Sequence, residues 1–119
     1  MHPFAGLVFA GLVLAGSVPA WAADPAAGYP SRPVRLITGS PGSTSDISAR
    51  FIAQKLSERW GQQVVVDNRP GAGGIIGTEI AAAAVPDGYT LAVGHIGTHA
   101  AAQFLFKKLA YDPIKDFAP

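Results

Sequence analysis

The chain has 119 residues, nine of them Lys or Arg and eight Asp or Glu, for a formal net charge of +1. The charged residues are scattered, so the sequence has neither a basic face for nucleic acid nor an acidic tail. The absence of cysteine excludes disulfides, thiolate metal sites and a thiol nucleophile. Glycine and proline are abundant but lie between apolar segments, which is typical of a folded α/β chain.

An uncharged apolar run, residues 4–18, is followed by the small-x-small pattern Ala20-Trp21-Ala22. This pattern predicts that residues 1–22 are a signal peptide cleaved after Ala22. No Lys or Arg precedes the run, which departs from the usual signal, and an uncleaved membrane anchor is the alternative. Export without cysteine favours the bacterial periplasm over a small disulfide-rich secreted module.

The first folded unit predicted by the sequence is a strand followed by a helix. Residues 34–38 have the β-branched, apolar composition of a strand. After a loop of small residues, Thr44 or Ser45 is expected to cap a helix that runs to about Trp60 and stops at Gly61. Its apolar stripe consists of Ala49, Ile52, Ala53, Leu56 and Trp60.

Two more strand–helix units follow. The pattern predicts a short, fully buried strand at 64–66, a loop at 67–74, a helix at 75–84, a turn at 86–88, a strand at 89–94 and a helix at 100–107. The order β-α-β-α-β-α indicates an α/β fold with a mostly parallel sheet and right-handed crossovers. In such sheets the first and third strands are often neighbours, and ligands bind beside the carboxyl ends of the strands.

Two loops rich in glycine, serine and threonine come at those carboxyl ends, at residues 39–46 and 94–98. The first precedes a helix N-terminus, whose unpaired N–H groups and dipole favour an anion. We therefore expect a ligand-binding crevice with seven candidate residues: Ser43, Thr44, Ser45, Asp46, His95, Gly97 and Thr98. A carboxylate facing an anionic ligand is repulsive, so Asp46 is expected to order the loop, with any ligand contact made through water.

A second group of residues is expected to shape the loops: Gly39, Pro41, Gly42, Asn68, Arg69, Gly71, Gly73 and Gly74. The glycine-rich part of this group is not a nucleotide fingerprint, because Gly-x-Gly-x-x-Gly would require glycine where Ile76 stands. Arg69 is either a clamp for its loop or a bidentate partner for a carboxylate.

Two other chemistries compete for the second loop. His95 and His99 have the i, i+4 spacing of a metal pair, but no third ligand is evident, so no metal is predicted. Ser45, His95 and Asp46 could be written as a catalytic triad. However, no Gly-x-Ser-x-Gly elbow is present, and adjacent Ser45 and Asp46 leave a helix in different directions.

Five motifs in order resemble the receptors of tripartite tricarboxylate transporters, the Bug family of periplasmic binding proteins. They are residues 29–35, Pro41-Gly42-x-x-Ser45-Asp46, residues 68–74, residues 86–91 and residues 109–119. The resemblance implies a type II periplasmic binding protein whose two lobes close on a small carboxylate and deliver it to a membrane permease. It also implies that residues 23–119 are the N-terminal part of the first lobe of a truncated chain, without catalysis or cofactor.

One position departs from the family pattern, because Ser43 stands where the loop usually has a second glycine. A Cβ there restricts the range of backbone angles, and this can change how many N–H groups converge and therefore which ligand is bound. The leading hypothesis is thus an exported carboxylate receptor. The alternatives are an exported α/β hydrolase or transferase using Ser45 and His95, and a truncated fragment without independent function.

Overall fold

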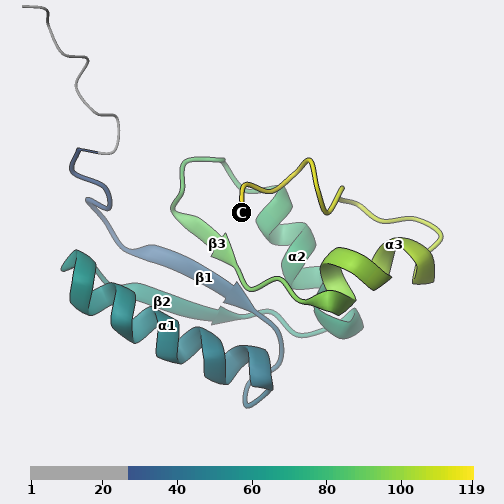
Figure 1. The fold of residues 1–119 in the computed structure, drawn as a ribbon, viewed down its shortest axis with the longest axis horizontal. Helices are drawn as coiled ribbons and strands as arrows, with labels where there is room; N and C mark the ends of the chain where they lie inside the picture. The colour runs from purple at the N-terminus through teal and green to yellow at the C-terminus, as the bar shows by residue number, and fades with distance from the viewer. Residues whose placement is uncertain (1–26) are drawn as a thin grey trace, which may run out of the picture.

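The computed structural model describes residues 27–119, and the predicted signal peptide lies outside this range. Three parallel strands form one sheet in the order β2-β1-β3, with β1 (Val34–Thr38) in the centre between β2 (Val64–Asn68) and β3 (Thr90–Ala92). The predicted α/β alternation and the pairing of the first and third strands are confirmed (Figure 1).

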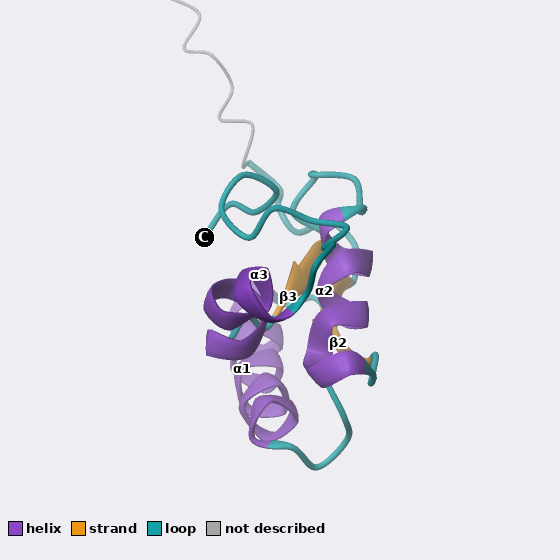
Figure 2. Ribbon diagram, turned by 90° about the vertical axis from the view of Figure 1, so that its right-hand side faces the viewer, coloured by secondary structure: helices purple, strands orange, loops and turns teal. Residues whose placement is uncertain are grey.

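Helices cover the two faces of the sheet, α1 (Thr44–Trp60) on one and α2 (Ile75–Ala82) on the other (Figure 2). Because side chains alternate along a strand, β1 contributes to both faces. Val34 and Leu36 pack with Ala49 and Ala53 of α1, whereas Ile37 lies against Gly77 of α2. The chain passes from β1 to α1 on one face of the sheet and from β2 to α2 on the other face. The two strand–helix connections therefore diverge at the carboxyl end of β1.

A second apolar cluster stabilises the end of the described chain. Ile75 of α2, Ala102 of α3 (Ala102–Leu105) and Tyr111 are all buried in it. The segment after α3 runs back across α2, and Leu109 and Phe117 pack against the cluster (Figure 1). The last helix and the C-terminal segment are therefore both packed against α2.

Several sequence-based boundaries and exposures were wrong. Val65 is 51% exposed, so the strand at 64–66 is not fully buried: β2 lies at the sheet edge, and its α2-side face lines an open groove. Ile52 of the α1 stripe is 47% exposed, because a three-stranded sheet covers only a narrow face of the helix. The helix predicted to 84 ends at Ala82, and the strand at 89–94 shortens to β3.

The last predicted helix differs most. A π-helical turn, η2 (Gly97–Ala101), precedes α3, and Phe106 has extended backbone angles (φ −110°, ψ 128°). Helical structure thus begins before residue 100 and stops before Lys107, so both ends of the predicted helix 100–107 differ from the observed ones. The reason is tertiary, because Ala102 and Tyr111 are buried on α2 and the chain must turn back between them.

Candidate functional site

The first loop is built around Ser43, which caps α1. Its backbone is extended (φ −71°, ψ 162°), and its hydroxyl accepts from the Asp46 N–H at 3.3 Å. The predicted cap, Thr44 or Ser45, was wrong by one or two residues, since both already belong to the helix. These backbone angles suit any L-residue, so serine fits without strain at the position where the family has glycine.

The hydroxyls of this loop are turned inward. Ser43 Oγ donates to the Ser40 carbonyl oxygen at 2.7 Å and lies 2.9 Å from Ser45 Oγ. With its one hydrogen on Ser40 and its acceptor sites facing Asp46 and Ser45, the Ser43 hydroxyl has no donor left for a ligand. Thr44 lies exposed at the first position of α1, where helix N–H groups have no intrahelical acceptor.

Asp46 is the centre of a hydrogen-bond network that joins three segments. Its carboxylate accepts from the Gly42 N–H and the Asn68 amide, both at 2.8 Å, and from Arg50 Nε at 3.1 Å. Asn68 also donates to the Gly39 carbonyl oxygen at 3.0 Å and accepts from the Arg50 guanidinium at 2.9 Å. The side chain of Asp46 is only 4% exposed. The network therefore ties the first loop to the end of β2.

The environment of Asp46 stabilises its charged form. The Asn68 amide, then the Gly42 N–H and the Arg50 guanidinium, lower the pKa of Asp46 from 3.8 to about 2. A carboxyl group with a depressed pKa stabilises the fold above its unfolded pKa, and this contribution disappears as the pH falls through the folded value.

We expect Asp46→Asn to remove one acid-sensitive contribution to stability. Urea unfolding at pH 7, 4, 3 and 2 should show wild type losing stability below about pH 4, with a smaller loss in the variant. Glu58→Gln is the control, because Glu58 is an exposed carboxylate of the same helix whose pair with Lys55 contributes little. Parallel pH profiles for wild type and Asp46→Asn would contradict the prediction.

Arg69 holds the backbone where β2 leaves the sheet. Its N–H donates to the Thr38 carbonyl oxygen at 2.8 Å, and its guanidinium pairs with Asp67 at 3.0 Å. Asp67 also pairs with Arg35, and these guanidinium contacts lower the pKa of Asp67 against the opposing effect of desolvation, the largest single influence. Of the two roles considered for Arg69, these contacts fit the clamp.

The glycine-rich segment after β2 adopts left-handed backbone angles throughout. Positive φ values occur at Gly71 (126°), Ala72 (46°), Gly73 (65°) and Gly74 (96°), after which α2 begins. This tight turn brings the start of α2 against the second loop: a Cβ on Gly74 would lie 3.1 Å from His95 Nε2 and 3.2 Å from Thr98 Cγ2.

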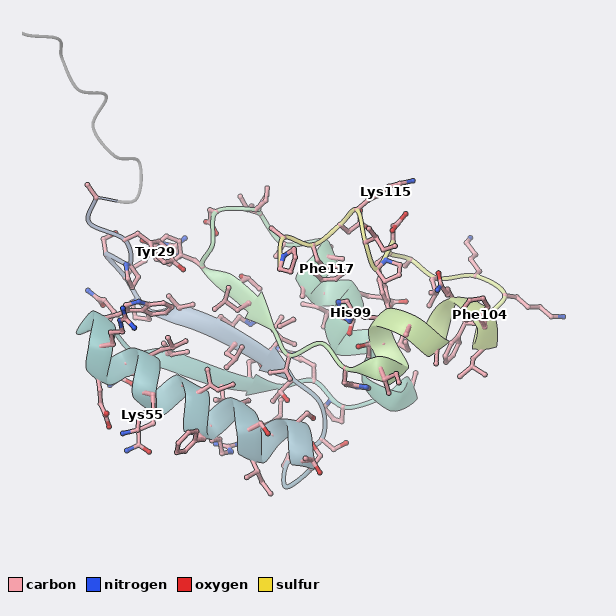
Figure 3. All side chains as sticks on the ribbon, viewed as in Figure 1. Tyr29, Lys55, His99, Phe104, Lys115 and Phe117 are labelled. Carbon is pink, nitrogen blue, oxygen red and sulfur yellow. The ribbon has the colours of Figure 1, made fainter. Side chains whose placement is uncertain are left out.

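The second loop is braced by its own hydrogen bonds and by the C-terminal segment. Thr98 is 1% exposed, and its hydroxyl lies within 3.2 Å of both the N–H and the carbonyl oxygen of His95. The Tyr111 hydroxyl donates to the Thr98 carbonyl oxygen at 2.6 Å. The rings of His99 and Phe117 lie 4.9 Å apart (Figure 3).

The two predicted loops converge only in part. A small cavity of about 10 Å³, roughly the size of one water, combines Gly39 with His95 and Thr98. Gly74, Gly77 and Thr78 of the α2 segment also line it, whereas residues 43–46 do not. Gly77, Thr78 and Arg50 were not predicted as site residues, although the i, i+4 spacing of Asp46 and Arg50 indicates their ion pair. Pro41 is exposed in the first loop.

Neither competing chemistry finds support among residues 27–119. No group of three or more His, Cys, Asp or Glu is placed to hold a metal in this part of the chain. Ser45 Oγ is hydrogen-bonded to Ser43 Oγ, and His95 Nδ1 accepts a hydrogen bond from the Gly97 N–H, so no Ser–His pair is formed.

None of the helices in the same range has the length and apolarity needed to cross a bilayer.

A parallel α/β sheet with small-residue loops at its carboxyl ends defines this segment as part of a periplasmic binding protein fold. Residues 48–119 match the model of the tripartite tricarboxylate transporter family receptor. The chain belongs to this family, which is a family of solute receptors and not of enzymes. Family membership indicates a periplasmic protein.

Similar proteins include a UPF0065 protein of Agrobacterium vitis, 46% identical over 99 residues, covering 82% of this chain and 28% of that protein. Among solved structures, MatC of Rhodopseudomonas palustris with bound malate is 44% identical, with a TM-score of 0.73 over 76% of this chain and 31% of its own. R. palustris Rpa4515 with adipate is 41% identical, with a TM-score of 0.69 over 71% and 29%. The periplasmic binding protein BugD is 40% identical, with a TM-score of 0.72 over 76% and 30%. The chain thus spans less than a third of the length of the proteins it matches.

Proposed function

We propose that this chain is part of a periplasmic receptor that binds a small organic carboxylate and delivers it to a membrane permease of the tripartite tricarboxylate transporter type. Residues 1–22 are the signal peptide in this proposal, with cleavage after Ala22. Residues 23–119 are the N-terminal part of the first of two lobes, and the cleft between the lobes holds the ligand.

The observation that carries the proposal is that hydrogen bonds within the protein occupy the Asp46 carboxylate. It accepts from Gly42, Asn68 and Arg50, and these contacts fix the first loop and compensate the negative charge of Asp46. Among residues 27–119 the first-turn N–H groups of Thr44 and Ser45 have no hydrogen-bond acceptor, so they can meet an anion at the start of α1. The ligands of the neighbours point to the same class, since malate and adipate are both dicarboxylates.

We expect the protein produced from its complete gene to be stabilised by at least one carboxylate from a panel of malate, adipate, citrate, aspartate and benzoate. At a ligand concentration of 100 times Kd, stabilisation should reach about 2.7 kcal/mol, measured as a shift in the unfolding midpoint. The fully methylated ester of the best ligand, which has no carboxylate, is the control. Absence of stabilisation by every acid, with the protein folded, would refute the proposal.

A further inference from the structure

The second loop offers two side chains that could donate to a ligand, and the hydrogen bonds distinguish between them. Thr98 has no group left to offer. Its N–H donates to the His95 carbonyl oxygen at 3.1 Å, and its own carbonyl oxygen accepts from Tyr111. The hydroxyl has one hydrogen, and acceptors for it lie at His95 O (3.2 Å) and His99 Nδ1 (2.9 Å). Thr98 therefore stabilises the loop from inside and is not a ligand donor.

His95 is different, because only one of its two ring nitrogens has a hydrogen-bond partner among residues 27–119. The Gly97 N–H donates to His95 Nδ1 at 3.1 Å, so Nδ1 is an acceptor without a proton. In a neutral imidazole the proton must then be on Nε2, which makes Nε2–H a donor.

Two glycines determine where this donor lies. A Cβ on Gly97 would come within 2.9 Å of His95 Cε1, and one on Gly74 within 3.1 Å of Nε2. A Cβ on either residue would therefore crowd the ring in its present position, and its Nε2 edge lies beside Gly74. The backbone of His95 is fixed as well, since its carbonyl oxygen accepts from the N–H groups of Thr98 and His99.

We propose that His95, held as its Nε2–H tautomer by Gly97, is the side-chain donor of the second loop and selects a ligand with an oxygen acceptor facing Gly74. This inference rests on the proposed receptor function and deepens it, because it assigns the polar recognition of one loop to one atom. His95 is itself exposed, so its replacement should leave the fold intact.

The test has one readout that needs no ligand. Long-range ¹H–¹⁵N NMR of the ligand-free receptor, produced from its complete gene, should give His95 the pattern of the Nε2–H tautomer. A predominant Nδ1–H tautomer would overturn the inference, whatever the protein binds.

The second readout is affinity for the best acid of the carboxylate panel in three proteins. His95→Gln places an amide N–H near the position of Nε2, whereas His95→Asn is too short and reaches only the position of Nδ1. We expect His95→Gln to bind within about threefold of wild type and His95→Asn about tenfold more weakly, with unchanged unfolding midpoints. Equal affinities of wild type and His95→Asn would overturn the inference. Failure of wild type to bind any acid would refute the receptor function instead.

Discussion

Asn68→Asp is expected to be the most damaging single-atom change in this segment. The Asn68 amide donates to the Asp46 carboxylate and to the Gly39 carbonyl oxygen. An aspartate of the same shape would remove both donors and place a second carboxylate 2.8 Å from the first. We expect a loss of about 2–4 kcal/mol in the free energy of unfolding at pH 7, together with loss of carboxylate binding.

Urea unfolding of the protein produced from its complete gene measures this effect, and Gln54→Glu is a matched control. Gln54 also donates to a carboxylate, that of Glu58, but on the exposed face of α1. There the same exchange should cost less than about 0.5 kcal/mol. Similar losses in the two variants would show that the Asp46 network does not depend on its partly buried setting.

The pH dependence of Asn68→Asp distinguishes repulsion from simple loss of shape. Two facing carboxylates share a proton, so one of the two pKa values of the pair is raised in the folded state. The stability that the variant loses relative to wild type should therefore be smallest at low pH and grow as the pH rises, opposite to the acid sensitivity that Asp46 gives wild type. A constant difference from wild type at every pH would contradict the repulsion argument.

Gly74→Ala should weaken carboxylate binding in addition to the loss of stability that its backbone strain causes. With φ at 96°, alanine at this position is expected to cost about 1–3 kcal/mol of stability. Its Cβ would also press on His95 Nε2 and Thr98 Cγ2, at 3.1 and 3.2 Å. Because that contact moves the second loop, we expect carboxylate affinity to fall about tenfold, measured by calorimetry.

Gly73 allows the effect of backbone strain to be distinguished from the effect of a Cβ contact with the second loop. Gly73 also has a positive φ, 65°, but a Cβ there would meet nothing within 4 Å. Gly73→Ala should thus lower stability by a comparable amount while leaving carboxylate affinity within about twofold of wild type. An equal loss of affinity in both variants would mean that backbone strain, and not the contact with His95 and Thr98, controls binding.

Local signals were enough to place the elements. The β-branched residues at 34–38 predicted β1 with its observed bounds, and Gly61 ends α1 in the left-handed conformation expected of a helix stop (φ 66°). Alternation of strands and helices indicated a parallel sheet, since short connections through helices bring strands into the same direction. The error at the last helix arose because its limits depend on Ala102 and Tyr111 packing on α2, which no local pattern encodes.

The places where polar atoms gather could be predicted from composition, because strand ends and small-residue loops are recognisable in it. Which of those atoms can still bind a ligand depends on how distant segments of the chain pack together. Asp46 and Thr98 were both plausible contacts in the sequence, yet Asn68, Gly42 and Arg50 occupy the first, and His95 and Tyr111 occupy the second. Hydrogen bonds between segments 13 and 22 residues apart depend on how β2 and the C-terminal segment pack, and therefore on the whole fold.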